Sequence, residues 1–162
     1  MKETAGMKIK SKKFLKDMGS RFVIDSSILI YHLEDIRPYS DLTELLISSI
    51  NMDKTKAYIS VISITEILTG PYSRGETDTI LAFNMFINSL SNLEIVPVDY
   101  LLAQDAARLR GIYKFRTPDA ILFATAIKRQ TFTFITNDRH FKKQNQSIIE
   151  GIRVILLDDY IA

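Results

Sequence analysis

The sequence contains no cysteine and only two histidines, His32 and His140. The absence of cysteine excludes disulfides, thiolate zinc sites, iron–sulfur clusters and cysteine nucleophiles. Two histidines cannot provide a three-histidine metal site. Any metal that this chain binds is therefore expected to be a hard cation held by oxygen ligands.

Long apolar segments and glycine-rich loops are also missing. No apolar run approaches the ~20 residues that a membrane-spanning helix needs, and residues 1–20 lack the continuous apolar segment of a signal peptide. We therefore expect a cytoplasmic protein that does not enter a membrane. The six glycines form neither a dinucleotide-binding pattern nor a P-loop, and no Gly-x-Ser-x-Gly motif occurs, which disfavours those enzyme classes.

The chain has 162 residues, enough for one domain with a substantial core. Its net charge of +2 is unevenly distributed, because the first twenty residues carry six lysines and two acids and the rest of the chain sums to −2. We interpret residues 1–20 as a basic N-terminal arm, either disordered or in a short helix, and 21–162 as the folded domain. Such an arm is either a solvated tail or an aid in holding nucleic acid.

Short apolar, β-branched runs alternate with segments of helical periodicity from residue 22 onward. The predicted strands lie at 22–25, 58–59, 94–98, 133–136 and 153–157. The predicted helices lie at 28–33, 41–51, 63–70, 78–90, 100–113 and 117–129. This alternation implies an α/β fold, with a mainly parallel sheet of about five strands and helices on both of its faces.

Four acidic residues stand where a ligand of such a sheet would bind. Asp25 ends the first strand, Glu66 lies in the helix after the second, and Asp138 follows the fourth. Asp119 is in the first turn of the helix before that strand. Ligands of open parallel sheets bind beyond the carboxyl ends of the strands. Close carboxylates repel one another unless a cation lies among them, and Mg²⁺ or Mn²⁺ binds carboxylates without histidine or cysteine.

Each acid also has a purely structural interpretation. Asp25 is able to cap the next helix, and Glu66 has capping-box spacing to Ser63. Asp119 is at a helix start, where a negative charge meets the positive end of the helix dipole, and Asp138 suits a turn. Capping-box spacing also places a helix start near 41, and Gly70-Pro71 predicts the end of the helix that begins at 63.

Four segments resemble the motifs of the PIN-domain family, and most closely those of VapC-type toxins from toxin–antitoxin pairs. They read VIDSSILI at 23–30, SVISITEIL at 60–68, TPDAILFATA at 117–126 and ITNDRHF at 135–141. The segments occur in the family's order, within a resemblance that spans roughly residues 21–160. The third and fourth motifs together are the most specific part of it.

This resemblance implies a three-layer α/β/α sandwich and RNA cleavage that depends on Mg²⁺ or Mn²⁺. It also implies a homodimer and inhibition by a small antitoxin-like partner whose tail enters the active site. The basic N-terminal arm is a departure, because it lies outside the usual minimal domain. Carried over residue by residue, the resemblance makes four residues catalytic and metal-binding and two supporting: Asp25, Glu66, Asp119 and Asp138, and Ser27 and Thr136.

Basic residues flank the third and fourth motifs. We single out Arg116 and Arg139 as candidates for RNA phosphate contacts, although such charges also occur on simply solvated surfaces. Asp99 is interpreted as a helix cap and Asp158 as a solvated residue near the C-terminus. His140 is given a structural or RNA-contacting role, because an acidic metal site needs no imidazole base.

Two other functions remain open. A receiver-type phosphoacceptor domain also places acids at strand ends, but it needs an acidic pair after the first strand and a lysine after a late strand. The chain has Ser26-Ser27 and Asn137-Asp138 instead. The other alternative is a non-catalytic PIN-like scaffold that binds RNA or protein, and the presence of all four acids argues against it.

Overall fold

A computed structural model describes residues 8–142 and 148–162 of the chain. Its centre is a six-stranded sheet in the order β3-β2-β1-β4-β6-β5. All neighbouring pairs are parallel except β5 with β6. The strands are β1 Arg21–Ile24, β2 Lys56–Ser60, β3 Leu93–Val96, β4 Thr133–Thr136, β5 Ile148–Ile149 and β6 Ile152–Leu156.

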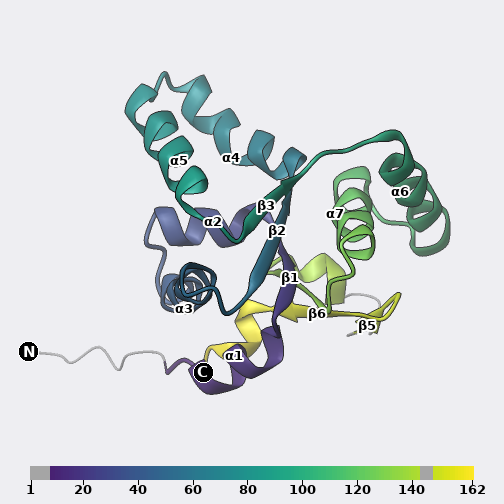
Figure 1. Cartoon of the computed structure of the whole chain (residues 1–162), viewed down its shortest axis with the longest axis horizontal. Coiled ribbons are helices and arrows are strands. Elements are labelled where there is room, and N and C mark those ends of the chain that lie inside the picture. Colours follow the sequence, from purple (N-terminus) through teal and green to yellow (C-terminus); the bar gives the residue numbers. More distant parts are fainter. Residues whose placement is uncertain (1–7, 143–147) are drawn as a thin grey trace, which may run out of the picture.

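Helices cover both faces of this sheet, as Figure 1 shows, with α2 to α5 on one side and α6 and α7 on the other. The helices are α1 Ser11–Met18, α2 Ser26–Leu33, α3 Tyr39–Asn51, α4 Val61–Ser73, α5 Thr77–Ser89, α6 Tyr100–Tyr113 and α7 Thr117–Lys128. Two 3₁₀ helices follow, η1 Arg139–Lys142 and η2 Leu157–Tyr160. Of the helices in the described ranges, none is long and apolar enough to cross a membrane.

Each face of the sheet carries its own hydrophobic core, because side chains along a strand point alternately to the two faces. In β1, Phe22 and Ile24 belong to the core under α2, α3 and α5, whereas Val23 belongs to the core under α6 and α7. The same alternation in β4 sends Ile135 to the first core and Phe134 to the second. The expected three-layer α/β/α sandwich with a mainly parallel sheet is confirmed.

Residues 11–18 of the predicted basic arm form helix α1, which packs on the first core through Phe14 and Met18. The chain ends are also joined by backbone hydrogen bonds, from the Lys10 N–H to the Tyr160 carbonyl at 2.8 Å and from the Ala162 N–H to the Lys8 carbonyl at 2.9 Å. The rest of the predicted arm, residues 1–7, lies outside the described residues.

Two predicted boundaries of helix α4 are wrong. Helix α4 does not end at Gly70-Pro71 but continues to Ser73, because the bond from the Arg74 N–H to the Gly70 carbonyl, at 3.1 Å, closes another turn after the proline. It begins after Ser60, whose hydroxyl accepts from the Ile62 N–H, so Ser63 is not its cap.

Helix α3 begins at Tyr39, two residues before the predicted start near 41. Asp41 therefore lies inside its first turn, where the carboxylate is free to pair with the Arg37 guanidinium at 2.8 Å. An ion pair thus takes the place of the predicted capping box at this helix start.

Candidate active site

The four predicted acids all line one open pocket of about 380 Å³ at the carboxyl ends of the strands. Asp25 and Asp138 follow β1 and β4, which are neighbours in the sheet. Glu66 lies in α4, directly after β2, and Asp119 lies in the first turn of α7. The parallel sheet thus brings together side chains that are far apart in the sequence.

Asp25 and Asp119 are the two buried acids of the pocket, and Asp25 has 7% of its surface exposed. Its carboxylate accepts hydrogen bonds from the Ser27 hydroxyl at 2.5 Å, from the Ser27 N–H at 3.0 Å and from the Thr136 hydroxyl. Burial raises the pKa of Asp25 to about 6, although these hydrogen bonds act in the opposite direction. Asp25 is also the N-cap of α2. The same side chain therefore caps a helix and lines the pocket.

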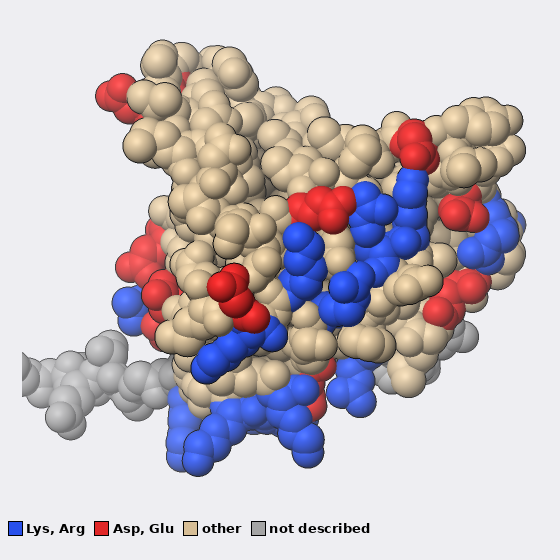
Figure 2. Space-filling view, in the orientation of Figure 1, with Lys and Arg blue, Asp and Glu red and all other residues tan. Residues whose placement is uncertain are grey.

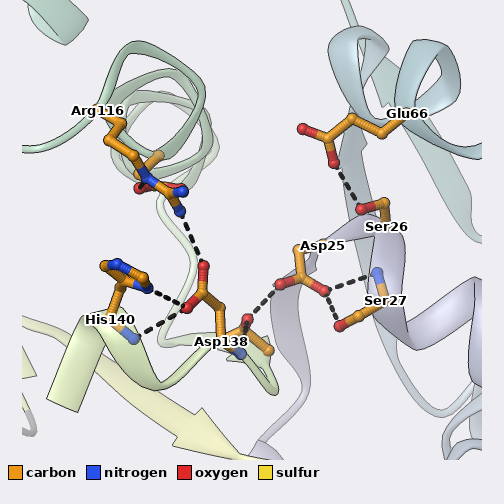
Figure 3. A network of polar contacts seen from close by, with 9 residues as sticks. Asp25, Ser26, Ser27, Glu66, Arg116, Asp138 and His140 are labelled. Carbon is orange, nitrogen blue, oxygen red and sulfur yellow. Dashed lines mark hydrogen bonds and ion pairs between the residues drawn. The ribbon is translucent and has the colours of Figure 1, made fainter.

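Glu66 faces Asp25 from the neighbouring helix (Figure 3). The Ser26 hydroxyl donates to its carboxylate at 2.5 Å, and the Glu66 side chain is exposed to solvent. Ser26 and Ser27 therefore each orient a different acid of the pocket. Both serines open helix α2, and consecutive residues of a helix lie about 100° apart around its axis, so their hydroxyls reach different acids.

Arg116 joins the other two acids. Its guanidinium donates from Nε to Asp119 Oδ2 at 2.8 Å and from Nη2 to Asp138 Oδ2 at 3.0 Å, and Figure 3 shows it reaching across from α7. The hydrogen bond to Asp119 is the main reason that the pKa of Arg116 is raised. A cation of the chain itself thus offsets the repulsion expected between these carboxylates.

Asp138 has a second set of partners in His140, whose N–H and ring Nδ1 both lie 2.9 Å from Asp138 Oδ1. Burial raises the pKa of Asp138, but the hydrogen bonds from His140 and the charges of His140 and Arg116 outweigh it, so the pKa is lowered overall. Asp138 is accordingly ionised over a wider pH range than Asp25. His140 contacts an acid of the pocket and orients it.

Arg139 does not line the pocket. Its guanidinium pairs with Asp158 at 2.9 Å and 2.7 Å, and Asp158 also accepts from the Tyr39 hydroxyl at 2.7 Å. The prediction that Asp158 is a solvated residue is therefore wrong, because η2 turns it back toward Arg139. Asp99 caps α6 through the Leu102 N–H at 2.9 Å, as predicted.

Sequence reasoning missed Tyr31 and Asn137, which also line the pocket. The Asn137 amide donates to the Tyr31 hydroxyl at 3.4 Å, and the Tyr31 ring stacks on Tyr39 with centroids 4.6 Å apart. Tyr31 lies four residues after Ser27 in α2, and that helical spacing would have placed both on one face. Asn137 belongs to the fourth motif, directly before Asp138, and that position is the sequence signal for it.

The donor set suits a hard divalent cation, since it consists of carboxylates and hydroxyls without thiol ligands. Among residues 8–142 and 148–162, no three acidic or histidine side chains are close enough together to hold one ion. The residue types therefore fit Mg²⁺ or Mn²⁺, whereas the spacing of the described side chains in this structure does not form a complete ion site. Arg116 is the side chain that already neutralises two of the four acids.

Comparison with protein families gives a match between residues 22–146 and the model of the PIN domain. Comparison with curated protein sequences gives no match.

Solved structures with this fold include three that are each less than 25% identical to this chain. A toxin–antitoxin complex from Klebsiella pneumoniae is 24% identical, with a TM-score of 0.58, and the match covers 83% of this chain and 95% of that one. VapBC2 from Rickettsia felis, bound to a DNA fragment from its promoter, is 20% identical, with a TM-score of 0.61 and coverages of 84% and 98%. The sarcin–ricin loop cleaving toxin VapC20 of Mycobacterium tuberculosis is 15% identical, with a TM-score of 0.61 and coverages of 82% and 98%.

Proposed function

The chain belongs to the PIN-domain family, and from that premise we propose that it is a metal-dependent endoribonuclease. The observation that carries the proposal is the pocket in which acids from four separate elements meet at the carboxyl edge of the sheet. Roles at helix starts would explain Asp25 and Asp119 separately, but they would not require the four acids to share one pocket. A single pocket of carboxylates is suited to a cation and a phosphodiester.

We assign Asp25, Glu66, Asp119 and Asp138 as the residues that would hold Mg²⁺ or Mn²⁺. When bound, such an ion supplies an activated water and charge stabilisation for phosphodiester hydrolysis. Ser27 and Thr136 hold the Asp25 carboxylate in place, and the hydrogen bonds that they donate favour its ionised form. In the proposed reaction, water attacks phosphorus and the bond from phosphorus to the 3′ oxygen breaks, which leaves 5′-phosphate and 3′-hydroxyl ends.

The proposal extends to partners. Because solved structures with this fold include toxin–antitoxin complexes, we propose that the chain is the toxin of such a pair. A small antitoxin-like protein would inhibit it, and two copies of the chain would form a homodimer. We further propose that residues 21–162 form the nuclease domain, with the basic segment 1–20 added to it, and that the protein acts in the cytoplasm.

The test is incubation of purified protein with a mixed RNA pool in Mn²⁺, in Mg²⁺ or in EDTA. We expect cleavage only with a divalent ion, and 5′-phosphate products. Asp119→Asn should reduce cleavage on the order of 10²-fold, as loss of one group that stabilises transition-state charge does. Cleavage that persists in EDTA, or products with cyclic phosphates, would rule out the metal mechanism.

A thermal melt provides a readout that does not depend on cleavage. Mn²⁺ at a hundredfold excess over its dissociation constant should stabilise the wild type by about 2.7 kcal/mol. Asp119→Asn should show a smaller effect at the same Mn²⁺ concentration, because one ligand is lost. RNA binding without cleavage, combined with a melting temperature that Mn²⁺ does not change, would favour the non-catalytic scaffold instead.

A further inference from the structure

The opposite end of the sheet, where the strands begin, carries a group of basic side chains. Arg21 and Lys56 open β1 and β2 and are direct neighbours in the parallel register. Both cations lie over the ring of the buried Tyr58, at 5.3 Å and 5.8 Å from its centroid. The Arg21 guanidinium also donates to the Arg129 carbonyl at 2.8 Å, which ties the end of α7 to this edge.

Helix α1 extends this group. Lys12, Lys13 and Lys16 are exposed, whereas Phe14 and Met18 on the other side of the helix are buried in the core.

Figure 2 shows that lysine and arginine side chains gather across the middle and the lower edge of this face of the molecule. We call Lys12, Lys13, Lys16, Arg21 and Lys56 the amino-edge surface.

The charges of the amino-edge surface are not balanced locally. Within residues 8–142 and 148–162, none of its five cations has an acidic partner within 4.0 Å. The adjacent cations Lys128, Arg129 and Arg153 do pair, with Asp99, Glu94 and Asp17. Five positive charges without an acidic partner among the described residues form a surface for a partner with repeated negative charges.

We propose that the amino-edge surface binds the phosphate backbone of an RNA chain independently of its sequence. A nucleic acid suits a group of cations without acidic partners, because it presents a negative charge at every nucleotide. A membrane suits it less, since amphipathic helices that lie on lipid insert an apolar face. In α1 that face is turned to the protein core, and only Leu15, at 40% exposure, remains partly accessible.

The choice of RNA rests on the proposed nuclease function, but the surface is distinct from the acid pocket. Strands of four to five residues separate the two edges, a distance of about 15 Å at roughly 3.3 Å per residue. A long RNA is therefore able to contact the amino-edge surface while another of its nucleotides lies in the pocket.

The test measures binding of a fluorescently labelled single-stranded RNA of about 30 nucleotides, by anisotropy in EDTA across a range of salt concentrations. The variant is Lys12→Gln/Lys16→Gln/Lys56→Gln. Its control, Arg37→Gln/Arg74→Gln/Lys114→Gln, removes the same charge from other parts of the chain. We expect the first variant to bind at least about tenfold more weakly at low salt, with a salt slope smaller by about 2, at ~0.7 per phosphate contact. The control should keep the wild-type slope.

Equal weakening in both triple variants would mean that only net charge matters, and would overturn the proposal. An unchanged slope in the first variant would overturn it as well. The single variant Lys56→Glu reverses one charge at the half-buried start of β2 and should weaken binding in the same direction. Preferential binding to vesicles of anionic lipid over RNA would overturn the choice of partner. Because no step requires cleavage, an inactive nuclease would leave this result interpretable.

Discussion

The two ends of the same parallel sheet differ in how their charges are arranged. At the carboxyl edge, both arginines that were candidates for RNA contact are engaged by acids, Arg116 by Asp119 and Asp138 and Arg139 by Asp158. At the amino edge, the five cations of the amino-edge surface have no acidic partner in the described part of the chain. A net charge of +2 conceals this separation.

Helix direction provides a physical reason for the difference. In a parallel α/β sheet, helices start near the carboxyl edge and end near the amino edge, so their dipoles favour anions at one edge and cations at the other. Asp25 caps α2 and Asp119 lies in the first turn of α7, whereas Lys128 and Arg129 stand at the end of α7. In this topology the acids of the carboxyl edge suit a bound cation, and the cations of the amino edge suit a polyanion.

The largest expected effect concerns Phe14, which packs helix α1 on the first core. Phe14 is fully buried, and replacement of a buried phenylalanine by alanine costs about 3–5 kcal/mol. Phe14→Ala should therefore lower the free energy of unfolding by that amount, measured by urea denaturation. Leu15→Ala in the same helix, at a side chain that is 40% exposed, should cost less than about 1 kcal/mol. Equal losses in the two variants would mean that α1 is not docked on the core.

A smaller effect is expected from Asp25, a buried acid at the carboxyl edge. The folded pKa of Asp25, at about 6, is above its unfolded value of 3.8. Ionisation in the fold is therefore unfavourable, and the wild type loses stability as the pH rises from about 4 to about 6. Two pKa units correspond to about 3 kcal/mol at most. In EDTA, Asp25→Asn should remove this loss and be more stable than the wild type at about pH 8, with little difference at about pH 4.

Asp99→Asn is the matched control, at an acid that also caps a helix but is exposed. The hydrogen bond from Lys128 is the main cause of its lowered pKa. A lowered folded pKa contributes stability that is present above the unfolded pKa and lost as the pH falls through the folded one. Asp99→Asn should therefore destabilise at about pH 8 and less so at about pH 3. If both variants changed stability in the same direction with pH, burial would not distinguish the two acids.

Much of the fold was predictable because strand ends and helix periodicity are local properties. Every predicted strand is present, and the assignment of Phe22, Val23 and Ile24 to alternate cores follows from strand geometry. Strand β5 was missed because it has only two residues, too few for a pattern. The turn after it has positive φ at Glu150 and Gly151, 52° and 78°. That is the geometry of a two-residue hairpin, and Gly151 was its only sequence signal.

The acids of the site were predictable for the same reason, since a parallel sheet collects its strand ends at one edge. The ion pairs of the site were not predictable from the sequence. Whether Arg116 contacts Asp138 and Arg139 contacts Asp158 depends on side-chain geometry between segments about twenty residues apart. Sequence identifies a cation beside an acidic motif, but it does not tell whether that cation faces a phosphate or a carboxylate.

The smallest expected effect concerns Arg116, the cation that pairs with two acids of the pocket at the carboxyl edge. Arg116 is 59% exposed, so solvent screens its pairs with Asp119 and Asp138, which are 10% and 33% exposed. In EDTA, Arg116→Gln should lower the free energy of unfolding by about 0.5–1 kcal/mol, because two neighbouring carboxylates lose their shared partner. Arg139→Gln is the matched control, because it breaks the exposed pair with Asp158 and should also cost at most about 1 kcal/mol.

The melting temperatures of the two variants should respond differently when Mn²⁺ is added. If the pocket holds a divalent ion, Mn²⁺ should restore Arg116→Gln to the wild-type melting temperature or above it, since the ion and the guanidinium neutralise the same acids. Arg139→Gln should keep its deficit. Equal responses of both variants to Mn²⁺ would mean that Arg116 and the metal do not share these carboxylates, and that the contrast between the two edges does not extend into the pocket.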